Sequence, residues 1–167
     1  PEHAAAQGTS AITAFDPALG DVKSRVELPY AGAYTGVFAA DGKRLYVACR
    51  GADRIVVLDT NPLKVVKAFA TAPGPAGVAL ADPQTLVVAA FNTSPGIVQF
   101  LDRETGEMRQ VLRVPPHPAA LAVHPRTGEI YVGCAGADVV LELDAKQREV
   151  KRTLAVGAHA SGLAVVD

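Results

Sequence analysis

Residues 44–59 read RLYVACRGADRIVVLD, and residues 129–144 read EIYVGCAGADVVLELD. In both stretches an apolar run ends at a Cys, a short segment with Gly and Asp follows, and a second apolar run ends at an Asp. Runs of this length and composition around turn residues are typical of two strands joined by a turn. The two copies are therefore either a duplicated chemical site or a duplicated structural unit.

The repetition extends over nearly the whole chain. An Asp closes an apolar run four times, at steps of 43, 43 and 42 residues: Asp16, Asp59, Asp102 and Asp144. Within residues 36–70, four apolar runs are separated by the segments DG, RGAD and TNPL, which contain the residue types that turns require. Four short strands in each repeat of about 40–45 residues are the signature of a β-propeller blade.

The stretch DGKRLYVACRGADRIVVLDTNPLKVVKAF, followed by PAGVAL, resembles the YVTN-repeat family of β-propellers, which is related to WD-repeat and lactonase-type propellers. The resemblance covers residues 9–167 and implies an all-β fold of four-stranded antiparallel blades. That family usually has Asn at the end of its name motif, whereas this chain has Cys49, Ala90 and Cys134. Members of that family are mostly binding and surface proteins, so the resemblance implies such a role for this chain and says little about activity.

The repeat predicts how the chain is divided. We expect a flexible lead-in at 1–8 and then β-propeller blades over 9–167, about 3.75 blades in all. They comprise a partial blade at 9–30, full blades at 36–70, 76–113 and 119–155, and a lone inner strand at 161–166. A lone inner strand would expose unpaired backbone groups, so we expect the ring to be completed. Three arrangements would complete it: the chain is a segment of a larger ring of about six to eight blades, it closes into a small four-blade ring, or it forms one half of a ring shared with a second subunit.

Composition restricts the function classes. The 16 basic and 17 acidic residues nearly cancel, which gives no electrostatic reason to expect nucleic acid. No apolar run is long enough for a membrane span, and HAAAQ at 3–7 resembles the flank of a signal-peptidase site, which predicts a periplasmic or extracellular protein. The motifs G-x-S-x-G, H-E-x-x-H and G-x-x-x-x-G-K-[ST] are absent. We expect the few aromatic residues to lie in strands and to form no stacking platform.

Blade geometry places the loop between the second and third strands on the same face as the loop between blades. This loop face, the usual ligand face of a propeller, is predicted to carry Arg50, Asp53, Asp138, His117 and His159. Two imidazoles at the channel mouth would bind a metal or polarise an anionic or carbonyl ligand. The alternative is that both are turn residues. Because the repeat offers no third ligand, we predict no metal and no cofactor.

Two further features have a structural and a functional interpretation. Cys49 and Cys134 hold equivalent positions two blades apart. Because packed sheets are about 10 Å apart, the two residues should be separated by about 20 Å, which is too far for a disulfide. We therefore predict that both are buried thiols. The outermost strands carry a basic rim, whose charges either protect a sheet edge or dock an acidic partner or an anionic membrane surface. The rim residues are Lys64, Lys67, Arg109, Arg113, Lys151 and Arg152, with Lys23 and Arg25 in the partial blade.

These observations predict a non-enzymatic extracytoplasmic β-propeller that acts as a protein-binding, scaffold or accessory module of a larger assembly. The alternative is a lactonase-like or quinoprotein-type, redox-linked propeller domain. In that case His117 and His159 would lie at the channel mouth and Arg50 would orient an anion.

Overall fold

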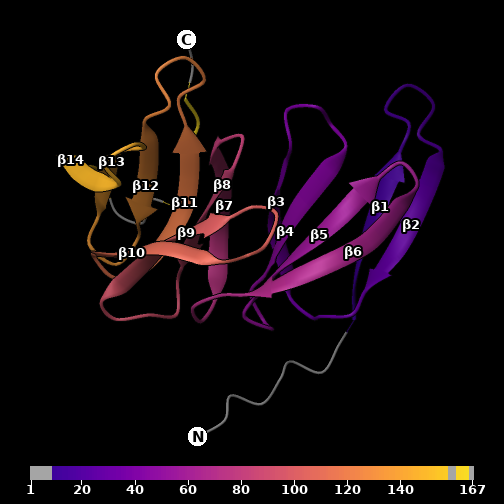
Figure 1. Ribbon diagram of the computed structural model, residues 1–167, viewed down its shortest axis with the longest axis horizontal. Coiled ribbons are helices and arrows are strands. Elements are labelled where there is room, and N and C mark those ends of the chain that lie inside the picture. Colours follow the sequence, from indigo (N-terminus) through magenta and orange to yellow (C-terminus); the bar gives the residue numbers. More distant parts are fainter. Residues whose placement is uncertain (1–8, 158–160, 166–167) are drawn as a thin grey trace, which may run out of the picture.

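The computed structural model describes residues 9–157 and 161–165, which form β-strands joined by turns (Figure 1). Blade 1 holds β1 (Ser10–Phe15) and β2 (Val22–Leu28). Blade 2 holds β3 (Ala33–Phe38), β4 (Arg44–Cys49), β5 (Arg54–Thr60) and β6 (Leu63–Ala70). Blade 3 holds β7 (Pro75–Asp82), β8 (Thr85–Ala90), β9 (Gly96–Asp102) and β10 (Met108–Val114). Blade 4 holds β11 (Pro118–Val123), β12 (Ile130–Cys134), β13 (Val139–Asp144) and β14 (Glu149–Ala155).

Each sheet is an antiparallel meander in which every strand pairs with its sequence neighbours. Figure 1 shows the sheets fanned out in chain order, from β1 and β2 in indigo to β14 in yellow. The first strand of blade 3, β7, contacts the first strands of both neighbouring blades, β3 and β11. The predicted all-β architecture of four-stranded antiparallel blades is therefore confirmed. Among the described residues, no helix is long and apolar enough to span a membrane.

The strand pattern follows from where each strand lies in its blade. The middle strands β4, β5, β8 and β9 are almost entirely buried, because neighbouring sheets cover both of their faces, and they read as continuous apolar runs. The outer strands β2 and β10 alternate between buried and exposed positions, as expected for strands with one solvated face.

Three of the repeated Asp residues are turn residues. Asp102 Oδ1 accepts hydrogen bonds from the backbone N–H groups of Glu104 and Thr105, both at 2.8 Å. Asp16 and Asp144 make the same two contacts in blades 1 and 4. These backbone donors, together with Arg109, lower the pKa of Asp102 to about 2. Three of the four recurring Asp residues are therefore architectural turn residues, and the fourth, Asp59, forms ion pairs with Arg44 and Lys64.

A repeated contact joins each blade to the next. Lys67 on β6 of blade 2 donates to the Glu104 carbonyl and pairs with its carboxylate at 3.1 Å, in the turn between β9 and β10. Gln110 on β10 donates to the Arg148 carbonyl of blade 4 at 3.1 Å. Gly106 lies directly over Phe69 of blade 2, because a Cβ at this position would be 2.2 Å from Phe69 Cδ1. Side-chain-to-turn contacts thus supplement the apolar packing between blades.

Both cysteines are buried, free thiols, as predicted. Cys49 packs with residues of blades 1 and 2, and Cys134 packs with residues of blades 3 and 4. Burial raises the pKa of each thiol to about 11.

The predicted inner strand at 161–166 is not found. Residues 161–165 form no strand, because none of the described strands offers them a neighbouring ladder, and Val166 lies outside the described residues. They do lie beside the first strands of blades 2, 3 and 4, with Ser161, Gly162 and Leu163 close to Tyr34, Gly77 and Leu121.

Candidate functional site

Four side chains on the loop face form a stack that crosses three blades. The Arg50 guanidinium lies over the Phe91 ring, 4.1 Å from its centroid, and it also lies 5.5 Å from the centroid of the Tyr34 ring. Phe91 also stacks with the His117 imidazole, with centroids 4.7 Å apart and planes inclined by 18°. We call Tyr34, Arg50, Phe91 and His117 the loop-face stack.

Equivalent backbone positions in successive blades build this stack. Arg50 and Phe91 each follow the second strand of their blade. The backbone N–H of Arg50 donates to the Gly32 carbonyl, and that of Phe91 donates to the Gly74 carbonyl, both at 2.8 Å. Ala135 occupies the same position in blade 4 and donates to the His117 carbonyl at 3.0 Å. Neighbouring blades therefore bring side chains at this position side by side.

Tyr34 owes its position to a β-bulge. The pairing of β3 with β4 shifts register between Ala33 and Thr35, and the same shift occurs around Ala76 in β7 and Ala119 in β11. A bulge leaves its extra residue outside the ladder and re-aims the side chain. The other two blades have Ala at this position, whereas blade 2 has a tyrosine that is 61% exposed.

His117 stands where the other two blades have glycine. Its φ is 57°, and the equivalent residues Gly32 and Gly74 have φ values of 74° and 70°. The left-handed conformation costs an L-residue roughly 1–2 kcal/mol that glycine avoids, and such strain is often found at functional sites. The sequence alignment had matched His117 with Ala33 and Gly74. The ladders pair Ala33 with Cys49, Pro75 with Ala90 and Pro118 with Cys134. The residues before these three are therefore equivalent, and the counterpart of His117 in blade 2 is Gly32.

Arg50 is the charged member of the loop-face stack. Its Nη2 donates to Asn92 Oδ1 at 3.4 Å. The Asn92 side chain packs against Gly74, where a Cβ would come within 2.5 Å of Asn92 Cγ. Within the described part of the chain, no carboxylate forms an ion pair with Arg50, and the side chain is half-buried. The stack therefore presents a positive charge that this face does not neutralise.

The other residues predicted on the loop face have different positions. Asp53 Oδ1 accepts a hydrogen bond from Gly74 N at 2.7 Å, and its φ of 54° places it in a tight turn. Asp138 has a φ of 53° in the equivalent turn of blade 4 and is exposed. His159 lies outside the described residues. Three or more His, Cys, Asp or Glu side chains arranged to hold a metal occur nowhere in 9–157 and 161–165.

The sequence did not single out Tyr34, Phe91 or Asn92. The expectation that the aromatic residues lie in strands was wrong for Phe91, which follows β8 and stacks with Arg50 and His117. A usable signal was present. Aligning the residue that follows each second strand gives Arg50, Phe91 and Ala135, of which two carry large side chains.

The basic rim is largely neutralised by carboxylates of the same chain. Five of its six predicted cations form ion pairs: Lys64 with Asp59 (3.6 Å), Lys67 with Glu104 (3.1 Å), Arg109 with Asp102, Lys151 with Glu129 (2.7 Å) and Glu142 (3.2 Å), and Arg152 with Glu142. Arg113 is exposed and has no ion pair with any described residue. The rim therefore offers little uncompensated charge to a partner.

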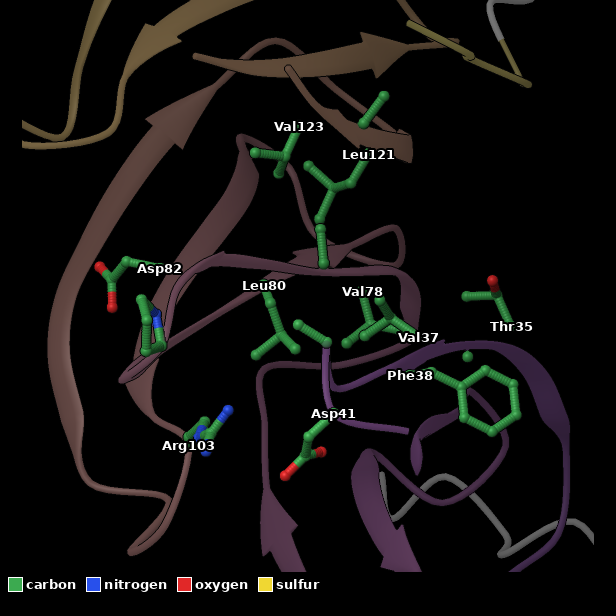
Figure 2. Close-up of a pocket in the computed structure, with 15 residues that line it drawn as sticks. Thr35, Val37, Phe38, Asp41, Val78, Leu80, Asp82, Arg103, Leu121 and Val123 are labelled. Carbon is green, nitrogen blue, oxygen red and sulfur yellow. The ribbon is translucent and has the colours of Figure 1, made fainter. Parts of the chain in front are cut away.

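A second concave region runs along the first strands of blades 2, 3 and 4. This inner groove has a volume of about 710 Å³. Figure 2 shows its apolar side chains, including Val78 and Leu121, with Asp41, Asp82 and Arg103 on one side of them. None of the four stack residues lines it.

Solved structures share this architecture. Kuenenia stuttgartiensis hydrazine synthase matches with a TM-score of 0.73 and 18% identity over 81% of this chain and 39% of its own. A functionally unknown protein from Desulfotomaculum acetoxidans DSM 771 matches with a TM-score of 0.72 and 18% identity, over 87% and 48%. The dihydro-heme d1 dehydrogenase NirN, in complex with DHE, matches with a TM-score of 0.70 and 22% identity, over 89% and 33%. The fold is a β-propeller.

The likeness establishes the propeller fold, not the activity. The chain spans less than half the length of each of these three proteins. No protein-family model matches the chain, and no curated protein matches it. The relation to the YVTN-repeat family stays a resemblance based on sequence motifs.

Proposed function

We propose that this β-propeller is a non-enzymatic binding module that docks a protein partner on its loop face. The loop-face stack carries this proposal. Tyr and Arg are enriched among the residues that dominate binding energy at protein interfaces. Here an exposed tyrosine and a half-buried arginine lie together on one surface. A location outside the cytoplasm stays a prediction.

The departures from the repeat support a binding role for this face. Tyr34 replaces the Ala of the other blades, and His117 replaces a Gly although glycine fits the backbone better. Residues that maintain a blade are expected to recur from blade to blade, whereas these side chains are large where their counterparts are small. The rim fits the docking role less well, since most of its cations are already paired.

The test is affinity capture from the native host with the full-length protein and two variants. Tyr34→Ala reproduces the Ala that blades 3 and 4 carry at this position, so the fold should tolerate it. Arg113→Ala removes the unpaired rim cation and is the matched control. We expect Tyr34→Ala to weaken partner binding by about thirtyfold, which corresponds to a hot-spot loss of about 2 kcal/mol. Loss of the partner with Arg113→Ala but not with Tyr34→Ala would assign docking to the rim instead.

A second candidate is a small-ligand or redox-linked propeller domain. The inner groove favours it, because about 710 Å³ is within the usual size of small-molecule sites. Two of the three structural neighbours are named as a synthase and a dehydrogenase. Native mass spectrometry and an absorption spectrum of the purified full-length protein test this candidate. A stoichiometric bound small molecule supports it, and a spectrum and mass of polypeptide alone count against it.

A further inference from the structure

The Arg50 guanidinium lies close to two aromatic rings. Its Cζ is 4.1 Å from the Phe91 centroid and 5.5 Å from the Tyr34 centroid. The five N–H donors of a guanidinium lie in its plane and point outward from its edge. Among the described residues, the only side-chain acceptor for them is Asn92 Oδ1. The edge therefore retains in-plane donors for an external acceptor.

Arg50 combines partial burial with the lack of an ion pair. Arg44 pairs with Asp59 at 3.1 Å, and Arg25 pairs with Glu27 at 2.9 Å. Arg50 has no such partner in the described residues, although it is half-buried beside two rings. A partly desolvated cation without a counter-ion is costly, so an anion that reaches it gains more than one at an exposed arginine.

We infer that the loop-face stack binds a planar carboxylate, which Arg50 holds edge-on through two parallel N–H donors. Arg and carboxylate form this bidentate pair with matching planar geometry. A carboxylate can lie in the plane of the guanidinium N–H donors with both oxygens, whereas a tetrahedral phosphate places some of its oxygens outside that plane.

The neighbours of Arg50 fix it for this task before any ligand arrives. Asn92 holds Nη2 from the side, and the Asn92 side chain is itself confined by Gly74. His117 backs the far face of the Phe91 ring. Ordering these side chains in advance lowers the entropy that binding would otherwise lose.

This inference rests on the proposed function, because the carboxylate is one that a protein partner presents. Its experiment uses three small probes: benzoate, the uncharged isostere benzamide, and phenyl phosphate. The readout is the side-chain Nε–H signal of Arg50 in a ¹⁵N-labelled sample of the full-length protein. We expect benzoate to bind roughly tenfold or more tightly than benzamide, since hydrogen bonds to a charged group are the stronger ones, and more tightly than phenyl phosphate.

Two variants separate charge from geometry. Arg50→Ala copies Ala135 of blade 4, so an unchanged circular dichroism spectrum and melting temperature are expected while benzoate binding is lost. Arg50→Lys keeps the charge but lacks the planar pair of donors, and we expect it to bind benzoate about tenfold more weakly than the native protein. Equal binding of benzoate and benzamide, tighter binding of phenyl phosphate, or benzoate binding that survives Arg50→Ala would each overturn the inference.

The source of the carboxylate is resolved with two peptides that differ only in its position. One has a single internal Glu and an amidated C-terminus, and the other has Gln at that position and a free C-terminus. Tighter binding of the first assigns the site to a side-chain carboxylate, and tighter binding of the second assigns it to a chain end; binding of neither contradicts the inference. Partner capture that needs Tyr34 but tolerates Arg50→Ala would refute the carboxylate and leave the docking proposal standing. Benzoate binding without any captured protein would do the reverse.

Discussion

Replacing Gly106 with Ala would test how closely blade 3 packs on blade 2. Gly106 has a φ of 74°, and a Cβ there would lie 2.2 Å from Phe69 Cδ1, 2.4 Å from Cγ and 2.9 Å from Cβ. Rotation of the Phe69 side chain does not relieve the last of these contacts, because its Cβ is fixed by the backbone. The new methyl group therefore strains the turn and pushes the two blades apart.

The magnitude combines three terms. The left-handed conformation costs Ala about 1–2 kcal/mol, and overpacking against a buried ring costs about 1–3 kcal/mol. The loss of glycine from the unfolded chain offsets about 0.4–1 kcal/mol of this. We therefore expect Gly106→Ala to lower the free energy of unfolding by roughly 1–4.5 kcal/mol.

Gly20→Ala is the matched control. Gly20 ends the equivalent turn of blade 1 with a φ of 76°, and no described atom lies within 4 Å of the added Cβ, so only the backbone terms apply. Urea unfolding followed by circular dichroism, which suits a chain without Trp, should separate the two variants by about 1–3 kcal/mol. Equal losses for Gly20→Ala and Gly106→Ala would refute the packing argument. In a Phe69→Ala background the contacts with Cδ1 and Cγ are removed and only the contact with Cβ remains, so the excess cost of Gly106→Ala should shrink.

Two further predictions follow from the ionisable groups. Five carboxylates have a lowered pKa in the folded protein: Asp16, Asp102, Glu129, Glu142 and Asp144. The stability that they contribute is present above their ordinary pKa values of 3.8 for Asp and 4.5 for Glu. It is lost as the pH falls toward about 2, the pKa of Asp102. The urea midpoint should fall progressively below about pH 4.5, and a constant midpoint between pH 5 and pH 3 would contradict this. Cys49 and Cys134, with their pKa values raised to about 11, should not react with a disulfide reagent at pH 8 until urea unfolds the protein. Labelling of either thiol at the same rate in the native protein would disprove their burial.

The fold could be predicted from the sequence because the same turn residues recur in successive repeats. Asp16, Asp102 and Asp144 accept the same pair of backbone hydrogen bonds at the end of their strands, so the chemistry of one turn recurs along the chain. The buried middle strands read as uninterrupted apolar runs for the same reason. The first strands were harder to delimit. They begin at Ala33, Pro75 and Pro118, ahead of the motifs that marked them, because a bulge adds a residue that the repeat pattern does not reveal.

The bulge explains why the sequence missed Tyr34, which lies ahead of the predicted strand. The alignment of His117 was off by one residue in blade 2, where its counterpart is Gly32. Arg50 was identified as the residue without a counterpart, but its ring neighbours come from blades 2 and 3. Contacts between side chains of different blades depend on how the sheets are arranged in space, and a linear period contains no such information.

The two faces of the blades differ in how their residues contribute to stability. The turns that begin with Asp16, Asp102 and Asp144 lie opposite the loop face. Those of blades 3 and 4 also join their blade to the preceding one. On the loop face, the strain at His117 costs about 1–2 kcal/mol, while its ring contact with Phe91 returns only about 0.5–1.5 kcal/mol. The fold therefore gains little or nothing from an imidazole at this position, and glycine would serve the backbone better. Stability therefore does not account for His117, whereas the docking role proposed for the loop face would give this side chain a use.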